Sequence, residues 1–326
     1  MNVVVTGAAG FIGSRLSRSL LDAGCRVTGI DCLTDFYSPR LKKRNLAPLL
    51  GRREFHWLAE DLNDLPLGRV LRGAEAIVHL AAQAGVRDSW GRQFEVYIRH
   101  NIRATQKLLE ASKKLSLRVF LNASSSSVYG QSPDLPFKES SPLHPLSPYG
   151  VTKLAAEDLC TLYFHNYGVP AVSLRFFTVY GPGQRPDMAF HKFLKAIGEG
   201  REITVFGDGT QTRDFTYVDD IVAACHAALQ QGRPGQVYNI GGGHRERLDR
   251  VFAVLEKVTG RPVRIAAADV QKGDVRDTFA DITKAKQELG FRPGTELEDG
   301  LRRQWEDIQE LYAPRKRAGT RKGSAS

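Results

Sequence analysis

The sequence predicts an α/β protein with a doubly wound parallel sheet and a smaller, mixed α/β C-terminal lobe. Two observations lead to this class. Short β-branched runs alternate with helix-period segments through the first half of the chain, and such alternation builds parallel sheets through right-handed crossovers. After Tyr180 the alternation stops at a turn-rich Gly-Pro-Gly-Gln-Arg-Pro segment, and shorter elements follow.

Buried strands are expected where apolar, β-branched runs are bounded by turn residues, and helices where apolar residues recur every three to four positions. The expected strands of the first half are Val3–Thr6, Arg26–Asp31, Glu54–Ala59, Ala76–His79, Val119–Asn122 and Val172–Phe176. The expected helices there include Phe11–Ala23, Phe94–Leu115 and Tyr149–Tyr167. Beyond Tyr180 we expect helices Phe190–Glu199, Arg247–Thr259 and Glu296–Leu311, and strands Ile203–Phe206 and Val237–Ile240.

The length of 326 residues fits about two domains or one large α/β unit. We expect a Rossmann-like nucleotide-binding domain over residues 1–180 and a substrate lobe over 181–312 that returns in part to the same sheet. The last segment, 313–326, contains mainly Gly, Ser, Lys and Arg and is expected to be a disordered basic tail.

Composition excludes several classes of protein. No run of 18 apolar residues is present, so no membrane-spanning helix is expected. The chain enters a strand directly after Met1, without a signal-like stretch, which favours a cytoplasmic protein. Its four cysteines form no CxxC pair and are expected to be buried free thiols, with neither a metal site nor a disulfide framework.

The net charge of +10 invites a nucleic-acid hypothesis. Two segments, Ala313–Ser326 with five basic residues and Arg40–Arg53 with six, carry all of the excess, and neither contains an acidic residue. No DNA or RNA motif accompanies them, and neither segment contains an aromatic side chain. We therefore expect no nucleic-acid partner, and we place Arg40–Arg53 in a loop after the second strand.

A glycine-rich turn joins the first expected strand to the first helix. Gly7, Gly10 and Gly13 follow the spacing GxxGxxG, which permits a tight turn and aims a helix N-terminus at a pyrophosphate. Asp31 ends the second strand, where a carboxylate can bind ribose hydroxyls and repel a 2′-phosphate, favouring NAD over NADP. Asp31 could instead cap a turn, and the nearby Lys42 and Lys43 weaken the preference for NAD.

Tyr149 and Lys153 open another expected helix four residues apart, so both side chains lie on one face. A neighbouring cation favours the phenolate and lowers the tyrosine pKa, as proton abstraction requires. The same spacing also occurs as a surface pair on amphipathic helices. A run of four serines, Ser124–Ser127, follows the fifth strand, at the sheet edge where ligands of doubly wound folds bind.

Six motifs occur in one order: TGAAGFIG, HLAAQAGVR, SSSSVYG, SPYGVTK, RFFTVYGP and RDFTYVDD. With them the chain resembles the extended short-chain dehydrogenase/reductases, the NAD-dependent nucleotide-sugar epimerases and dehydratases, over about residues 2–312. The resemblance implies a catalytic triad of Ser125, Tyr149 and Lys153. As NAD-binding residues it implies Gly7, Gly10, Phe11, Ile12, Gly13, Asp31, Asp61, Leu62, Leu80, Ala81, Ala82, Asn101, Tyr149 and Lys153.

Within that family, the segments Asp35-Phe36-Tyr37, Gln83–Arg87 and Gly183–Ala189 are similar to those of UDP-glucuronate 4-epimerases. The resemblance implies that Arg213 and Arg276 hold the UDP diphosphate, which guanidinium grips bidentately. The residues implied for UDP-sugar binding are Arg87, Ser126, Ser127, Thr178, Arg185, Arg213 and Arg276. Arg185 is expected near the sugar carboxylate, or else paired with Asp187 in its own loop.

The implied reaction oxidises the sugar at C4, with Tyr149 taking the hydroxyl proton, and reduces the keto sugar on its other face. UDP-glucuronate decarboxylases stay an alternative, although they carry a glutamate where this chain has Ser127. Neutral UDP-glucose/galactose 4-epimerases share the triad, and a non-catalytic nucleotide-sugar binder is a further option. Dehydration is disfavoured because Ser126 and Ser127 replace an Asp-Glu pair. A homodimer is implied through helices Phe94–Leu115 and Tyr149–Tyr167, whose apolar residues could also simply pack on the sheet.

Overall fold

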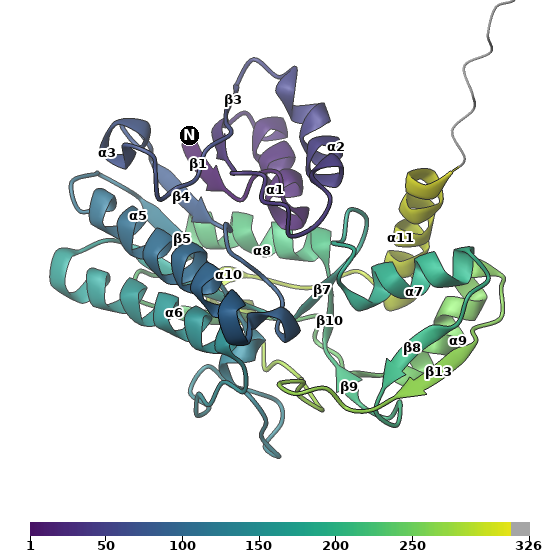
Figure 1. The fold of residues 1–326 in the computed structure, drawn as a ribbon. Coiled ribbons are helices and arrows are strands. Elements are labelled where there is room, and N and C mark those ends of the chain that lie inside the picture. Colours follow the sequence, from purple (N-terminus) through teal and green to yellow (C-terminus); the bar gives the residue numbers. More distant parts are fainter. Residues whose placement is uncertain (314–326) are drawn as a thin grey trace, which may run out of the picture.

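The computed structural model describes residues 1–313, which build a seven-stranded, wholly parallel sheet in the order β11-β6-β5-β4-β1-β2-β3 (Figure 1). The strands are β1 (Asn2–Thr6), β2 (Arg26–Ile30), β3 (Phe55–Leu58), β4 (Ala76–His79), β5 (Val119–Ser125), β6 (Ala171–Phe176) and β11 (Val237–Ile240). The strand order reverses between β1 and β4. In such sheets the crevice outside the carboxyl ends at this switch point binds ligands, so the Rossmann-like fold predicted from the sequence is confirmed.

Both faces of the sheet are covered by helices. Val3 and Val5 of β1 pack into one apolar cluster, whereas Val4 between them packs into another, because successive strand residues point to opposite faces. The first cluster lies under α1 (Phe11–Asp22), α2 (Pro39–Leu50) and α8 (Val218–Gln231). The second lies under α3 (Leu67–Val70), α5 (Ala104–Ser112) and α6 (Pro148–Tyr167), of which α5 and α6 run side by side.

The expected helix Phe94–Leu115 is interrupted. It comprises α4 (Phe94–Tyr97), a π-helical turn over Ile98–Arg103, and α5. The turn brings the side chain of Asn101 inward, where its amide bonds the Gln83 backbone. The apolar periodicity runs on through the turn, so it did not reveal the interruption.

The basic segment Arg40–Arg53 is mostly helix rather than the expected loop. Helix α2 begins at Pro39, whose fixed φ and missing N–H suit a first helical position. It buries Lys42, Leu46 and Leu49 at helical spacing, while its other basic side chains reach solvent. The sequence prediction also stopped β5 too early, because Ser124 and Ser125 belong to the strand rather than to the loop after it.

The C-terminal lobe, at the right of Figure 1, combines short strand pairs with three packed helices. Its helices are α7 (Ala189–Gly198), α9 (Leu248–Thr259) and α11 (Leu297–Tyr312), and α10 (Thr283–Leu289) packs near α8. Its pairs are β7 (Thr178–Tyr180) with β10 (Phe215–Tyr217), β8 (Ile203–Phe206) with β13 (Ile265–Ala268), and β9 (Thr212–Arg213) with β12 (Glu246–Arg247). Strand β11 then returns to the main sheet beside β6.

Cys25, Cys160 and Cys225 are buried as expected, but Cys32 is exposed because it lies beyond the end of β2. Across residues 1–313 no helix has the length and apolar character that a membrane crossing requires. Of the tail predicted over 313–326, everything after Ala313 lies outside the described residues.

Candidate active site

The turn between β1 and α1 closes so tightly that its glycines cannot carry side chains. Gly7 has φ +70°, and a Cβ added there would lie 2.8 Å from the Ala81 nitrogen. A Cβ on Gly13 would lie 2.1 Å from the Gly7 carbonyl oxygen. Gly10 is the N-cap of α1, with its backbone extended. The turn therefore leaves the helix N-terminus open to close approach by a pyrophosphate, and Phe11 and Ile12 begin the helix behind it.

Asp31 lies beside this turn, and the two oxygens of its carboxylate accept hydrogen bonds from two different backbone amides. One oxygen accepts from the Ala9 amide at 3.2 Å, and the other accepts from the Leu33 amide at 2.8 Å. The capping role that the sequence left open is thus present, and Leu33 adopts φ +53° next to it. The carboxylate faces the glycine turn from the end of β2, which is the placement expected for a ribose contact.

Lys42, which the sequence already places near Asp31, is buried beside that carboxylate. Its side chain is 7% exposed, its Nζ lies 4.0 Å from Asp31 Oδ1, and it donates to the Thr34 hydroxyl at 2.9 Å. Burial lowers the pKa of Lys42, while the Asp31 carboxylate opposes that shift. A cation paired with Asp31 offsets part of the repulsion that favours NAD over NADP. Only the burial of α2 could have shown this.

The next strand ends carry the other residues predicted to bind the cofactor. The Asp61 carboxylate accepts from the Asn63 amide at 2.8 Å and from Arg99 Nη2 at 2.8 Å; despite partial burial, these bonds hold the pKa of Asp61 below its usual value. Leu62 is buried beside it. After β4, the Ala81 amide donates to the Thr6 hydroxyl at 3.1 Å, and Leu80, Ala81 and Ala82 follow one another along the half-exposed strand end.

Asn101 is almost fully buried and connects two elements of the site. Its Oδ1 accepts from the Gln83 amide at 2.7 Å, and its Nδ2 donates to the Gln83 carbonyl and to the Thr152 hydroxyl. A single side chain therefore ties the segment after β4 to α6 between Tyr149 and Lys153. In the described structure Asn101 therefore holds two segments of the site at a fixed separation.

Helix α6 begins directly at the site. Ser147 caps it by accepting from the Gly150 amide at 3.1 Å, and Pro148 takes its first position. A Cβ on Gly150 would lie 2.6 Å from the Ser127 carbonyl oxygen, so this glycine lets the helix start against the serine segment. Tyr149 and Ser125 are brought face to face as a result.

Burial raises the pKa of the Tyr149 phenol, while the Arg185 guanidinium and a hydrogen bond with Ser125 act to lower it. The Ser125 hydroxyl also bonds the Ser127 hydroxyl and accepts from the Ser127 amide, each at 3.1 Å. Ser125 and Arg185 therefore act on the phenol, and Ser127 holds Ser125 in place. Ser126 and Thr178, also predicted for the substrate, are half-buried.

Lys153 is buried, and its Nζ donates to the Ala123 carbonyl at 2.7 Å. Burial lowers the pKa of Lys153 to about 8, although Glu157 one turn later opposes the shift. The sequence predicts Lys153 as a cation acting on Tyr149. In this structure the Arg185 guanidinium acts to lower the pKa of the phenol, and Lys153 Nζ is bonded to β5.

Arg185 is paired with Asp187, the second of the two expectations for it. Its Nε and Nη2 bind the Asp187 carboxylate at 3.0 and 2.8 Å, while its charge reaches Tyr149 and Tyr37. Burial raises the pKa of Tyr37 to about 12, against the effect of Arg185. Since one edge of the guanidinium is occupied by Asp187, Nη1 is the end left for another ligand.

The arginines predicted for the diphosphate meet around one loop of the C-terminal lobe. Arg87 Nη2 binds Asp274 at 2.6 Å, and Arg213 Nη1 donates to the Arg276 carbonyl at 2.6 Å. Arg276 itself is exposed and donates to Thr210 at 3.0 Å. Burial lowers the pKa of Arg213, and Arg87 adds to the same shift. Three guanidinium groups so placed fit a dianionic ligand.

A doubly wound sheet, a helix-capping glycine turn and a Ser, Tyr and Lys cluster after β5 together define a dinucleotide-dependent enzyme of the short-chain dehydrogenase/reductase class. The family model described as the NAD-dependent epimerase/dehydratase family matches residues 3–241. The chain belongs to that family. The resemblance identified from the sequence motifs is therefore confirmed.

Individual relatives cover nearly the whole chain. An uncharacterized UDP-glucose epimerase, YtcB, of Bacillus subtilis (strain 168) is 46% identical over 96% of this chain and 99% of its own. A UDP-glucuronate 4-epimerase of Thermodesulfobacterium geofontis (strain OPF15) is 40% identical over 92% and 94%. The crystal structure of UDP-glucuronic acid 4-epimerase from Bacillus cereus, with UDP-glucuronic acid and NAD, superposes with a TM-score of 0.93 at 43% identity, covering 96% of this chain and 100% of that one.

Proposed function

We propose that this protein is a UDP-glucuronate 4-epimerase that uses NAD. The observation that carries the proposal is the Arg185 guanidinium, whose charge acts directly on the Tyr149 phenol. In a uronate the carboxylate sits on C5, next to the carbon whose hydroxyl a 4-epimerase oxidises. A cation that acts on the catalytic phenol therefore matches the carboxylate of such a substrate. The solved relative bound to UDP-glucuronic acid and NAD supports the same assignment.

The residues at the first strand fit a dinucleotide. The glycine turn that a Cβ would fill leaves room for the pyrophosphate, Asp31 faces the ribose position, and Asp61 with Leu62 would flank the adenine. When bound, NAD⁺ accepts the hydride from sugar C4 and later returns it.

This chain's own groups handle the proton. Tyr149 takes the proton of the 4-hydroxyl, and Ser125 holds the reacting oxygen by a hydrogen bond. The Arg185 charge favours the phenolate that burial disfavours. Lys153, held by the Ala123 carbonyl, would hydrogen-bond the nicotinamide ribose. The keto sugar then turns in the pocket, and Tyr149 returns the proton as hydride reaches the other face.

The keto intermediate of a uronate is a β-keto acid, which decarboxylates unless its carboxylate is held out of alignment. Arg185, Ser127 and Thr178 are the groups we assign to that task. The decarboxylase alternative is less favoured, since Ser127 occupies the place where decarboxylases of this family carry a glutamate.

A neutral-sugar epimerase is the second candidate. The B. subtilis relative, named as a UDP-glucose epimerase, is 46% identical. Pairing with Asp187 could also keep Arg185 occupied in the absence of a carboxylate.

One experiment separates these reactions. The purified protein is incubated with UDP-glucuronate and, separately, with UDP-glucose, and the nucleotide sugars are followed by ¹H NMR. We expect UDP-galacturonate from the first and slow or no conversion of the second. A UDP-pentose with CO₂ would identify a decarboxylase, and UDP-galactose alone would identify the neutral epimerase. Either of those results contradicts the proposal.

We further propose a homodimer through α5 and α6. On α6, Val151, Leu162 and Tyr167 are each about half exposed, an apolar set suited to a partner helix. Sedimentation of Leu162→Glu beside the unchanged protein tests this, since a charge in that face should give monomers. A cytoplasmic location is proposed as well, in keeping with four free cysteines.

A further inference from the structure

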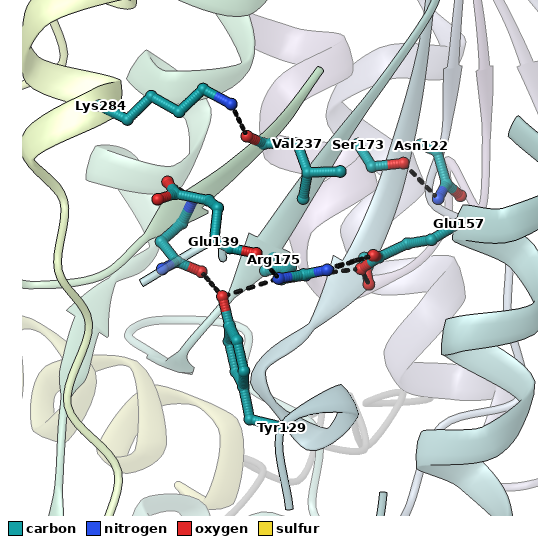
Figure 2. A network of polar contacts seen from close by, with 10 residues as sticks. Asn122, Tyr129, Glu139, Glu157, Ser173, Arg175, Val237 and Lys284 are labelled. Atoms are coloured by element: carbon teal, nitrogen blue, oxygen red, sulfur yellow. Dashed lines mark hydrogen bonds and ion pairs between the residues drawn. The ribbon is translucent and has the colours of Figure 1, made fainter. Parts of the chain in front are cut away.

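A buried ion pair joins helix α6 to strand β6 (Figure 2). Glu157 of α6 binds Arg175 of β6 through Nε at 3.0 Å and Nη2 at 2.7 Å, and both side chains are 4% exposed. Burying two charges costs more than their attraction returns unless further hydrogen bonds complete them. Even a pair completed in this way is weak evidence for a role in stability, because apolar side chains of similar volume often serve as well, and its position suggests another role.

We propose that Glu157 is a positioning residue for Lys153 and for the carboxyl end of β5. Two side chains of helix α6 form hydrogen bonds with consecutive residues of this strand. Lys153 Nζ donates to the Ala123 carbonyl at 2.7 Å, and Glu157, one turn later on the same helix face, accepts a hydrogen bond from the Ser124 hydroxyl. The next residue is Ser125. The distance between the proposed catalytic serine and lysine is thus set by two adjacent contacts.

Glu157 is also the carboxylate whose charge raises the pKa of Lys153 against the effect of burial. The other titratable groups facing Lys153 are Cys160 on the same helix and His79 from β4, whose pKa Lys153 lowers. Burial disfavours the charged ammonium of Lys153 and lowers its pKa, and Glu157 opposes that shift. Glu157 therefore favours the protonated Lys153 that hydrogen-bonds a ribose.

Arg175, the other member of the ion pair, makes further hydrogen bonds on the side away from Glu157. Arg175 Nη1 donates to the Tyr129 hydroxyl at 2.8 Å and to the Glu139 carbonyl at 3.2 Å, and Tyr129 in turn donates to Asn239 Oδ1 at 2.7 Å. Arg175 also stacks its guanidinium over the Tyr129 ring. The network holds Glu157 from behind, so its carboxylate keeps one orientation toward Ser124 and Lys153.

The test compares Glu157→Gln with Asp158→Asn. Both remove one negative charge from adjacent positions of α6, but Asp158 is exposed and points away. The first readout is the pKa of Lys153, followed by the ¹³Cε resonance of labelled lysine and assigned with a Lys153→Arg variant. We expect Glu157→Gln to lower this pKa by about one pH unit and Asp158→Asn to leave it within about 0.2.

The second readout is the pH profile of kcat with UDP-glucuronate, and this part rests on the proposed function. Glu157→Gln should lower kcat about tenfold to a hundredfold and move the high-pH decline to lower pH, in step with the Lys153 pKa. The resonance experiment needs no turnover. If the protein proves inactive with every nucleotide sugar, the proposed function fails, whereas an unchanged Lys153 pKa overturns the inference about Glu157.

A double variant, Glu157→Gln with Arg175→Met, removes the uncompensated guanidinium that could unfold the single variant. If Glu157 serves only the fold, the double variant should regain both the stability and the Lys153 pKa of the unchanged protein, and the proposal falls. If Glu157 positions Lys153, stability returns while the lowered pKa and kcat persist. Glu157→Asp, which keeps the charge, should recover most of the pKa.

Discussion

The two sides of the active site are held together by different kinds of contact. On the sheet side, Lys153, Glu157 and Arg175 are buried and bonded to strand residues. On the side of the C-terminal lobe, ion pairs are partly exposed: Arg87 and Asp274 are 40% and 24% exposed, and Arg185 and Asp187 are 21% and 27% exposed.

Solvent decides what each kind of contact can do. A buried, multiply bonded group keeps one position, because breaking it leaves an unpaired charge or donor in a medium of low polarity. An exposed pair contributes at most about 1 kcal/mol and exchanges its partner easily. The chain therefore fixes the groups proposed for chemistry and leaves exchangeable the guanidiniums proposed to meet a charged ligand.

The largest effect should come from the buried side. Tyr149→Phe removes the only group proposed to take the hydroxyl proton, so we expect kcat to fall at least about a thousandfold, with the fold unchanged. Turnover of UDP-glucuronate is the measurement. Tyr163→Phe is the matched control, since its phenol on the same helix bonds Glu110 and Gln106 instead. Equal losses in both variants would refute the assignment of Tyr149.

The second-largest effect should be on how the free energy of unfolding depends on pH, through His79 of β4. His79 is fully buried between the Thr6 and Thr105 hydroxyls, and burial lowers its pKa to about 3. The unfolded chain binds a proton near pH 6.5, whereas the folded chain does not. The free energy of unfolding that this provides is complete above pH 6.5 and is lost as pH falls, by about 3 kcal/mol at pH 4.

Urea unfolding of His79→Gln from pH 7 to pH 4 measures this contribution as a flatter dependence on pH. His56→Gln is the control, because His56 is exposed on β3. If both variants keep the slope of the unchanged protein, His79 does not titrate on unfolding.

Substitutions in the partly exposed ion pairs on the side of the C-terminal lobe should change substrate choice more than the free energy of unfolding. Replacing Arg185 by Met removes the cation beside Tyr149, so we expect kcat/KM for UDP-glucuronate to fall about a hundredfold. Any residual activity with UDP-glucose should fall less. Arg201→Met removes an exposed guanidinium paired with Glu199 and should change neither. Equal losses for both sugars would place Arg185 in catalysis alone.

The smallest effect belongs to the Arg87–Asp274 contact. Asp274→Asn should change the free energy of unfolding by less than about 1 kcal/mol, since the pair is partly exposed. It should tighten binding of UDP a fewfold, because Arg87 then meets the diphosphate without competition. Calorimetric titration with UDP measures the change. Weaker binding would mean that Asp274 orients Arg87 rather than competing for it.

Most of the fold was predictable because its signals are local. The glycine turn, the apolar strands and the spacing of Tyr149 and Lys153 depend on near neighbours in sequence. The structure contains them within a residue or two, except that β5 runs to Ser125. Helix α2 was missed because its basic residues masked a buried stripe, and the π-turn at Asn101 because side-chain contacts to Gln83 produce it.

The site was only partly predictable for the same reason. The motifs identified Ser125, Tyr149, Lys153 and Arg185, but they could not show which cation reaches the phenol. Arg185 comes from a loop 36 residues after Tyr149 along the chain, and only folding brings them together. Lys42 at Asp31 and Glu157 at Ser124 were hidden because burial, unlike spacing, is a property of the whole fold.

The sequence by itself determined the class of this protein: a doubly wound sheet whose strands and helices are each encoded locally, a dinucleotide turn and a tyrosine–lysine helix. Tertiary structure alone decided the electrostatics, namely that Arg185 acts on Tyr149, that Lys153 is directed to Ala123, and that Glu157 stands behind it. The physical reason is that a charge acts through distance and desolvation, which depend on residues far apart in the chain.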